Sequence, residues 1–328
     1  MTALLITDVR PWGRSATDVA VLDGRIVAAL PEGVEPQVVQ GRGRLLLPSF
    51  SDVHVHLDST RIGLPFREHT GSPGIWPMVM NDRANWRSAE LPVAERAELT
   101  LGRMIARGAT RVRSYAQIDV DAGLERFDAV RRAKETHADR CDVAVIAFPQ
   151  AGLLREEGTV PLLEEALRQG ADVMGGIDPC TLDRDPKGHL DVVFDLAERY
   201  QVPIDIHLHE PGHLGVFSTD LVIERVRALG MQGQVTMSHA YDLGSVDEAT
   251  TRRLVETFAE LDIAMATVAP ARQQGLPLTA LAEAGVRVGL GEDGQRDYWS
   301  PYGNADMLDR TWQLAFTHAF RADELIEH

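Results

Sequence analysis

The feature that most constrains the fold is a repeated alternation of short β-rich runs and amphipathic helical patterns from residue 50 onward. Strands that alternate with helices predict a parallel sheet, and eight such units predict a closed (β/α)8 TIM barrel of the α/β class. A doubly wound open sheet is the alternative, but no glycine-rich phosphate-binding fingerprint follows any run, which disfavours a dinucleotide-binding sheet. The eight runs are 50–56, 110–115, 142–148, 172–177, 203–209, 235–239, 262–268 and 287–291.

The residues before the barrel predict a small N-terminal β domain. Four short runs, 4–9, 18–22, 25–30 and 37–40, are separated by turn signals such as Asp23-Gly24 and Gly41-Arg42-Gly43. Asp-Gly between alternating runs is a strong hairpin signal. We therefore expect a β domain over 1–48 and the barrel over 49–328.

Composition excludes several classes of protein. The formal net charge is −16 and no basic patch is visible, so neither a nucleic acid nor an anionic membrane is an expected partner. The two cysteines form no CxxC motif or disulfide framework, which is typical of a reducing cytoplasm. No apolar run approaches the ~18 residues of a membrane span. The sequence predicts a cytoplasmic protein that acts on a small molecule.

One connection is too long for an ordinary barrel loop. Residues 58–91 separate the first strand from its helix and include Trp76, Trp86 and the weak substrate-contact candidate His69. Loops of this length are usually functional or disordered. The aromatic and apolar content favours a packed lid over the barrel mouth rather than a disordered insertion.

Polar residues gather where the predicted strands end, and in an α/β barrel the active site lies at those carboxyl ends. Five of the ends supply five of the eleven histidines, three carboxylates and one amide. Random placement would not favour these positions. The residues are His54, His56, Gln150, His207, His209, Glu210, His239, Glu292 and Asp293.

These residue types predict a catalytic metal site. His54 and His56 stand at i and i+2 of a strand, so both imidazoles project to one face. With His207 and Asp293 they offer three imidazoles and one carboxylate, which suits a divalent metal with an open position for water. Such a metal lowers the pKa of its water toward ~7 and gives a hydroxide nucleophile at neutral pH.

The remaining strand-end residues supply proton transfer. Glu210 is the expected proton shuttle, and His239 is a second acid/base or charge-stabilising group. No lysine occurs near a strand end, so we expect a single metal rather than a pair bridged by a modified lysine.

The order and spacing of these residues resemble those of the amidohydrolase superfamily, within its cytosine deaminase-like branch, which also includes N-isopropylammelide amidohydrolase. The resemblance extends from about residue 45 to 314. It rests on PSFSDVHVHLD at 48–58, GATRVR at 108–113, AFPQ at 147–150, GADVMGG at 170–176, IDIHLHE at 204–210, MSH at 237–239, GEDG at 291–294 and DYWSPYG at 297–303.

The resemblance implies a role for each matching residue. It implies that one zinc or iron ion is held by His54, His56, His207 and Asp293, that Glu210 is the shuttle, and that His239 assists the metal-bound water. It further implies that Gln150 hydrogen-bonds the substrate ring and that Trp299 forms a pocket wall. The implied reaction is hydrolysis of a C–N bond, often with loss of ammonia from a cyclic amidine. Barrels of this family are often homo-oligomers, although the sequence identifies no interface.

The chain departs from the branch around the predicted substrate. RSYAQ stands at 113–117 where cytosine deaminases have RTHVD, HLHE at 207–210 where they have HCDE, and EDG at 292–294 where they have HDD. The chain also ends near its eighth helix, where relatives return to the β domain, so the sequence is either truncated or builds that domain from its N-terminus alone. The three altered motifs put cytosine itself in doubt as the substrate, but they do not change the predicted reaction class.

Several roles stay open. His209 is expected to contact substrate or to support a metal ligand, and the alternative is that it is itself a fifth ligand. Tyr115, also expected to bind substrate, and Arg113 either line the pocket or have structural roles. The leading function is a deaminase of a pyrimidine- or triazine-like ring. The alternatives are hydrolysis of a non-ring amide or N-alkyl group at the same site, and a non-catalytic metal- or ligand-binding barrel.

Overall fold

The computed structural model describes residues 2–67, 74–270 and 275–322. The chain forms two compact units, Met1–Ser49 and Phe50–His328. Within the described residues, no helix combines the length and the apolar character needed to cross a membrane.

The smaller unit is a four-stranded sheet in the order β3-β2-β1-β4. Asp23 and Gly24 form the expected two-residue hairpin turn, with φ angles of 47° and 77° that fit a type I′ turn. The expected turn at Gly41–Gly43 is wrong, because these residues lie inside β4, where the pairing register with β1 shifts and forms a bulge. The strands are β1 (Ala3–Pro11), β2 (Thr17–Leu22), β3 (Arg25–Val27) and β4 (Gln37–Leu46).

The larger unit confirms the α/β barrel. Its eight strands are parallel and follow chain order from β5 to β12. A bridge between Val55 and Asp293 joins the first strand to the residues after the last one, so the barrel is nearly closed. The strands are β5 (Phe50–Val55), β6 (Ala109–Gln117), β7 (Asp142–Phe148), β8 (Val173–Ile177), β9 (Ile204–His207), β10 (Val235–Ser238), β11 (Ala264–Thr267) and β12 (Val288–Leu290).

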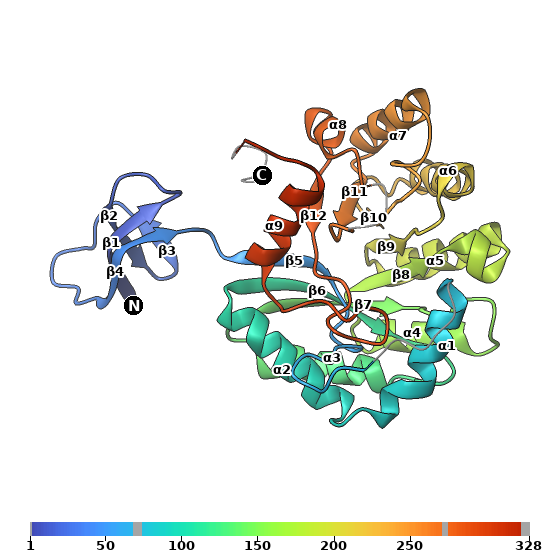
Figure 1. Cartoon of the computed structure of the whole chain (residues 1–328), viewed down its shortest axis with the longest axis horizontal. Helices are drawn as coiled ribbons and strands as arrows, with labels where there is room; N and C mark the ends of the chain where they lie inside the picture. Colours follow the sequence, from blue (N-terminus) through green and yellow to red (C-terminus); the bar gives the residue numbers. More distant parts are fainter. Residues whose placement is uncertain (1, 68–73, 271–274, 323–328) are drawn as a thin grey trace. The chain divides into compact units, whose positions relative to one another are not determined.

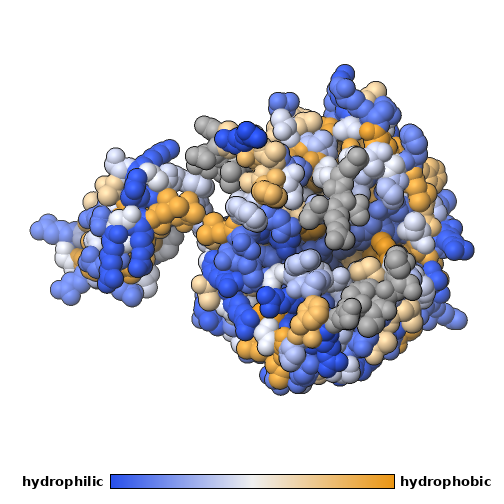
Figure 2. All heavy atoms as spheres, in the orientation of Figure 1, coloured by the Kyte–Doolittle hydropathy of each residue, from blue (hydrophilic) through white to orange (hydrophobic). Residues whose placement is uncertain are grey.

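Helices surround this sheet (Figure 1). Each carries one apolar face toward the strands. On α2 (Val93–Ala106), for example, Leu101 and Met104 are fully buried, and each such side chain contributes about 1.5–3 kcal/mol when removed from water. The outer surface is dominated by hydrophilic residues on the face seen in Figure 2. The α-helices that follow β6 in the chain are α3 (Glu125–Thr136), α4 (Thr159–Arg168), α5 (Pro186–Tyr200), α6 (Gly212–Leu229), α7 (Glu248–Glu260), α8 (Leu278–Glu283) and α9 (Met307–Thr317).

The long connection before α2 (Val93–Ala106) contains an ordered helix, α1 (Ile75–Asn85). Trp76 packs against the buried cluster that includes Tyr115, and Arg83 forms an ion pair with Glu156. Residues 75–91 are therefore packed against the barrel rather than forming a disordered insertion. Residues 68–73, and with them His69, lie outside the described part of the chain.

Candidate active site

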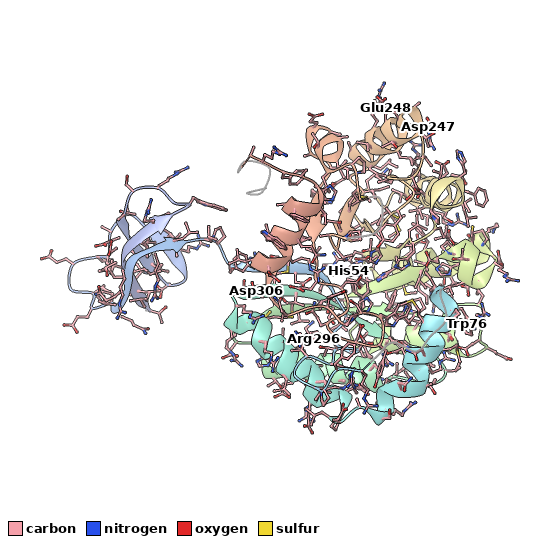
Figure 3. All side chains as sticks on the ribbon, viewed as in Figure 1. His54, Trp76, Asp247, Glu248, Arg296 and Asp306 are labelled. Atoms are coloured by element: carbon pink, nitrogen blue, oxygen red, sulfur yellow. The ribbon has the colours of Figure 1, made fainter. Side chains whose placement is uncertain are left out.

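Five residues from four strand ends converge inside the barrel. The Nε2 atoms of His207 and His56 lie 3.3 Å apart. Asp293 Oδ1 lies 3.5 Å from Nε2 of His56 and 3.6 Å from Nε2 of His54. His54 is labelled within the barrel in Figure 3. Ligand-type atoms lie within 4.8 Å of one another in two groups, His54 with His56 and His207, and His54 with His239 and Asp293.

The donor atoms fit a divalent metal. Among the described residues, Nε2 of His54, which lies 3.6 Å from Asp293 Oδ1, and Nε2 of His239 are sealed from solvent and have no hydrogen-bond partner. An unpaired buried polar atom is costly unless something satisfies it. Imidazole nitrogens with a carboxylate oxygen are the ligand types of zinc sites. His239 belongs to one of the two groups, so its imidazole lies among the candidate metal ligands.

Burial sets the ionisation of the cluster for metal binding. It lowers the pKa of His56 to about 3, and with the neighbouring imidazoles it keeps the pKa values of His207 and His239 well below the ordinary value. Burial alone would raise the pKa of Asp293, but its close contact with His54 and the neighbouring imidazoles of His239 and His56 outweigh burial and lower that pKa. Neutral imidazoles and an ionised carboxylate are the forms that bind metal.

The backbone at three strand ends is strained. His239, Asp293 and Asp178 have φ angles of 68°, 63° and 34° although none is glycine. Such conformations cost about 1–3 kcal/mol each and persist where the surrounding structure enforces them, often at functional sites.

Tyr115 contacts His54 and is not among the residues that line the cavity described below. Its hydroxyl lies 3.0 Å from both His54 Nδ1 and Ser238 Oγ, and the side chain is fully buried. Ser238 donates to Asp205, which also pairs with Arg113 at 2.7 Å. Since a carboxylate only accepts, Ser238 gives its proton to Asp205 and its oxygen can accept from Nδ1 of His54. This arrangement favours a His54 tautomer with a free lone pair on Nε2.

Replacing Tyr115 with phenylalanine is expected to weaken metal binding about 10–100-fold, the usual cost of losing a group that orients a metal ligand. A zinc titration against a competing chelator measures the affinity. The matched control is Tyr200→Phe, which removes a hydroxyl bonded to Glu164 on the helical surface and is expected to leave the affinity unchanged. Equal zinc affinity in Tyr115→Phe and the control would show that the hydroxyl does not position His54.

Glu210 is fixed by a turn that the sequence did not reveal. Its Oε1 accepts from the backbone N–H groups of Cys180 and Thr181 at 2.9 and 2.7 Å, and its Oε2 accepts from Ser218 at 2.5 Å. The first two groups lie in a π-helical turn, Pro179–Asp183. Burial raises the pKa of Glu210 above its ordinary value although these bonds oppose it. Glu210 is buried and is not among the residues that line the cavity.

His209 lines that cavity and has a carboxylate partner. Its Nδ1 lies 2.8 Å from Asp178 Oδ2, and its ring is 4.3 Å from that of His239. Burial opposes protonation, but the charge of Asp178 raises the pKa of His209. An imidazole held in one orientation by a carboxylate is a second arrangement suited to proton transfer.

The cavity has a volume of about 760 Å³ and joins the metal-ligand cluster to a polar wall. Gln150 and Trp299, both expected at the substrate, line it, as do His56, His207 and Asp293. The side chain of Gln150 makes no hydrogen bond to any described residue, so both its donor and acceptor are open to a ligand. Further polar residues of the lining are Asp58, Ser59, Gln117 and Asp297.

Four residues of the site escaped sequence reasoning. Asp178 follows β8 and Gln117 ends β6, so the rule that polar strand ends form the site would have found both. Asp205 shares a strand face with His207 by the i, i+2 rule. Ser238 ends β10, so the strand-end rule also points to it, but its role depends on Asp205 and His54 from other strands.

The chain is similar to several known proteins. The profile of a family described as "Amidohydrolase family" matches residues 76–327. An uncharacterized protein of Escherichia coli K12, YahJ, is 32% identical over 89% of this chain, and the chain spans 65% of that relative's length.

Two solved structures resemble the whole chain. N-isopropylammelide isopropylaminohydrolase of Burkholderia multivorans has a TM-score of 0.93 at 38% identity, covering 100% of this chain and 84% of its own. A 5-methylcytosine deaminase of Klebsiella pneumoniae has a TM-score of 0.77 at 26% identity, covering 98% of this chain and 82% of its own.

The chain belongs to the amidohydrolase family, within its cytosine deaminase-like branch. This places it among hydrolases that act on C–N bonds other than peptide bonds. Family members use a divalent metal, and the histidine-rich cluster can hold one.

Proposed function

We propose that this protein hydrolyses a C–N bond of a small cyclic amidine or amide, releasing ammonia or an amine from a pyrimidine- or triazine-like ring. The observation that carries the proposal is the convergence of unpaired imidazole nitrogens and the Asp293 carboxylate at a cavity lined by amides and Trp299. The names of the two solved relatives support a ring substrate.

In this proposal a single zinc ion, with iron as the alternative, is held by His54, His56, His207 and Asp293. When bound, it activates water for attack on the ring carbon. The His239 imidazole Nε2 lies in the same cluster and stabilises charge or takes a proton there. Gln150 hydrogen-bonds the ring and Trp299 packs against it, which fixes the ring for attack.

Proton movement is assigned to Glu210, which accepts a proton from water and delivers it to the departing nitrogen. Its raised pKa brings protonation closer to neutral pH, as a group that both accepts and donates requires. The His209–Asp178 pair is the alternative, since His209 is the one that lines the cavity.

A substrate panel tests the reaction class. N-isopropylammelide, 5-methylcytosine, cytosine and an open-chain N-alkyl amide are incubated with zinc-loaded protein, and released ammonia or amine is measured. We expect turnover of at least one ring compound and its loss on chelation. Turnover of the open-chain amide alone would favour the non-ring hydrolase. Metal binding without any turnover would favour a ligand-binding barrel.

A further inference from the structure

Gln117 is a second amide in the cavity wall. It is the last residue of β6, it lines the cavity beside Gln150, and only 3% of its surface is exposed. We infer that Gln117 determines substrate specificity, because its side-chain oxygen is a fixed hydrogen-bond acceptor for a ring N–H. This inference rests on the proposed function and narrows its substrate class.

The orientation of the Gln117 amide follows from its partner. Its Nε2 lies 2.6 Å from Asp119 Oδ2. An ionised carboxylate has no proton to donate, so the amide must turn its NH2 group toward Asp119. The amide oxygen is then the atom left for the cavity.

Asp119 is held as an ionised acceptor. Its Oδ1 accepts from the backbone N–H groups of Asp121 and Ala122 at 2.9 and 2.8 Å, and Arg83 lies 3.2 Å from Oδ2. Burial opposes ionisation, but the Ala122 N–H, the Gln117 amide and Arg83 outweigh it and lower the pKa of Asp119. Asp119 therefore holds Gln117 in one orientation.

The backbone of Gln117 is equally fixed. Its N–H donates to Asp58 Oδ2 at 2.9 Å, and the strand pairs with Phe148 of β7. Asp58 lies 3.6 Å from the buried Arg126. A rigid acceptor loses little freedom when a ligand binds, which strengthens discrimination.

The amide oxygen of Gln117 is available to a ligand. Among the described residues, no group donates a hydrogen bond to this oxygen. The oxygen is also absent from the set of unpaired atoms that are sealed from solvent, so a ligand in the cavity can reach it. A ring that covers it must supply a donor, or the acceptor is left buried and unpaired. Sites built to bond a substrate N–H reject analogues that lack it far more strongly than they reject a missing methylene.

The substrate class follows. A ring with a lactam N–H, such as an oxo-pyrimidine or a triazinedione, satisfies Gln117. An aromatic ring with only lone pairs at that edge places acceptor against acceptor. The site therefore selects the oxo, N–H form of a nitrogen heterocycle.

The test compares each ring substrate with its ring-N-methylated analogue, for example cytosine with 1-methylcytosine. We expect wild-type kcat/KM to favour the N–H compound by about 100-fold or more. Gln117→Leu should lower kcat/KM for the N–H compound about 10–100-fold and reduce the ratio to a few-fold. Asp119→Asn, whose amide can also donate, should let Gln117 turn and give an intermediate ratio. Gln169→Leu, which changes an exposed glutamine bonded to Glu165, is the matched control.

Thermal unfolding and zinc affinity verify that each variant is folded and metal-competent, and Gln117→Met replaces the leucine variant if that one does not fold. If Gln117→Leu keeps wild-type turnover and an unchanged ratio of kcat/KM between the N–H and N-methyl compounds, the inference about Gln117 fails while the proposed function stands. If the wild type hydrolyses no ring, the proposed function fails, and calorimetry with uracil and 1,3-dimethyluracil, which lacks both ring N–H groups, decides the inference. Preference for uracil that is lost in Gln117→Leu supports it, and equal or absent binding overturns it.

Discussion

Asp293→Asn is expected to lower kcat/KM by about 10³-fold and to weaken metal binding. Asp293 is the only carboxylate in the two ligand groups of the described residues. A metal contributes several kcal/mol to the transition state, and each 1.36 kcal/mol is a tenfold change in rate. Asparagine tolerates the positive φ of this position and keeps the backbone bonds to His54 and His56.

The same variant has a second readout in stability. Zinc at 100 times its Kd stabilises a folded protein by about 2.7 kcal/mol, so wild-type unfolding should shift upward with added zinc. Asp293→Asn should lose most of that shift. The control is Asp195→Asn, which makes the same change to an exposed carboxylate paired with Arg199 and is expected to behave like wild type. A full zinc-induced shift and normal turnover in Asp293→Asn would remove Asp293 from the metal site.

Glu210→Gln is expected to lower kcat by about 10²–10⁴-fold while leaving metal content unchanged, because it removes the proton carrier but no ligand. Glu210 must be ionised to accept the first proton. The wild-type rate should therefore rise with pH through the raised pKa of Glu210, and this acidic limb should disappear in the variant. Stopped assays across pH, with metal analysis of each sample, measure both.

Two further variants separate catalysis from structure at this position. Ser218→Ala removes the hydroxyl that donates to Glu210 but keeps the carboxylate, so its rate should fall much less than that of Glu210→Gln. His209→Asn tests the competing carrier. Normal turnover in Glu210→Gln together with a large loss in His209→Asn would transfer the shuttle to the His209–Asp178 pair.

The fold was predictable because its signals are local. The residues at 142–148 form β7 and those at 93–106 form α2, as predicted. Both could be recognised because a strand buried on both faces is a continuous apolar run, whereas a helix buried on one face has apolar residues three or four positions apart. The turn predicted at 41–43 is instead a bulge in β4, because Arg42 and Gly43 have the positive φ angles that many turns also use.

The site was predictable only in part. Strand-end position and the i, i+2 rule identified the histidines that converge, but they could not orient side chains. The contact between Tyr115 and His54 joins residues 61 apart, and that between Tyr115 and Ser238 joins residues 123 apart. The surroundings of Glu210 depend on a π-helical turn after β8, which has no clear sequence signature. Interactions that exist only after the barrel closes were therefore beyond sequence reasoning.

Stepwise reconstitution of metal-free protein tests the central claim most directly. Chelated protein is titrated with zinc while ammonia or amine release from the best ring substrate is followed. Our prediction is no turnover before zinc is added and a linear rise that ends at one equivalent per chain. Turnover that persists in the metal-free protein, or protein that binds no metal at all, would contradict it.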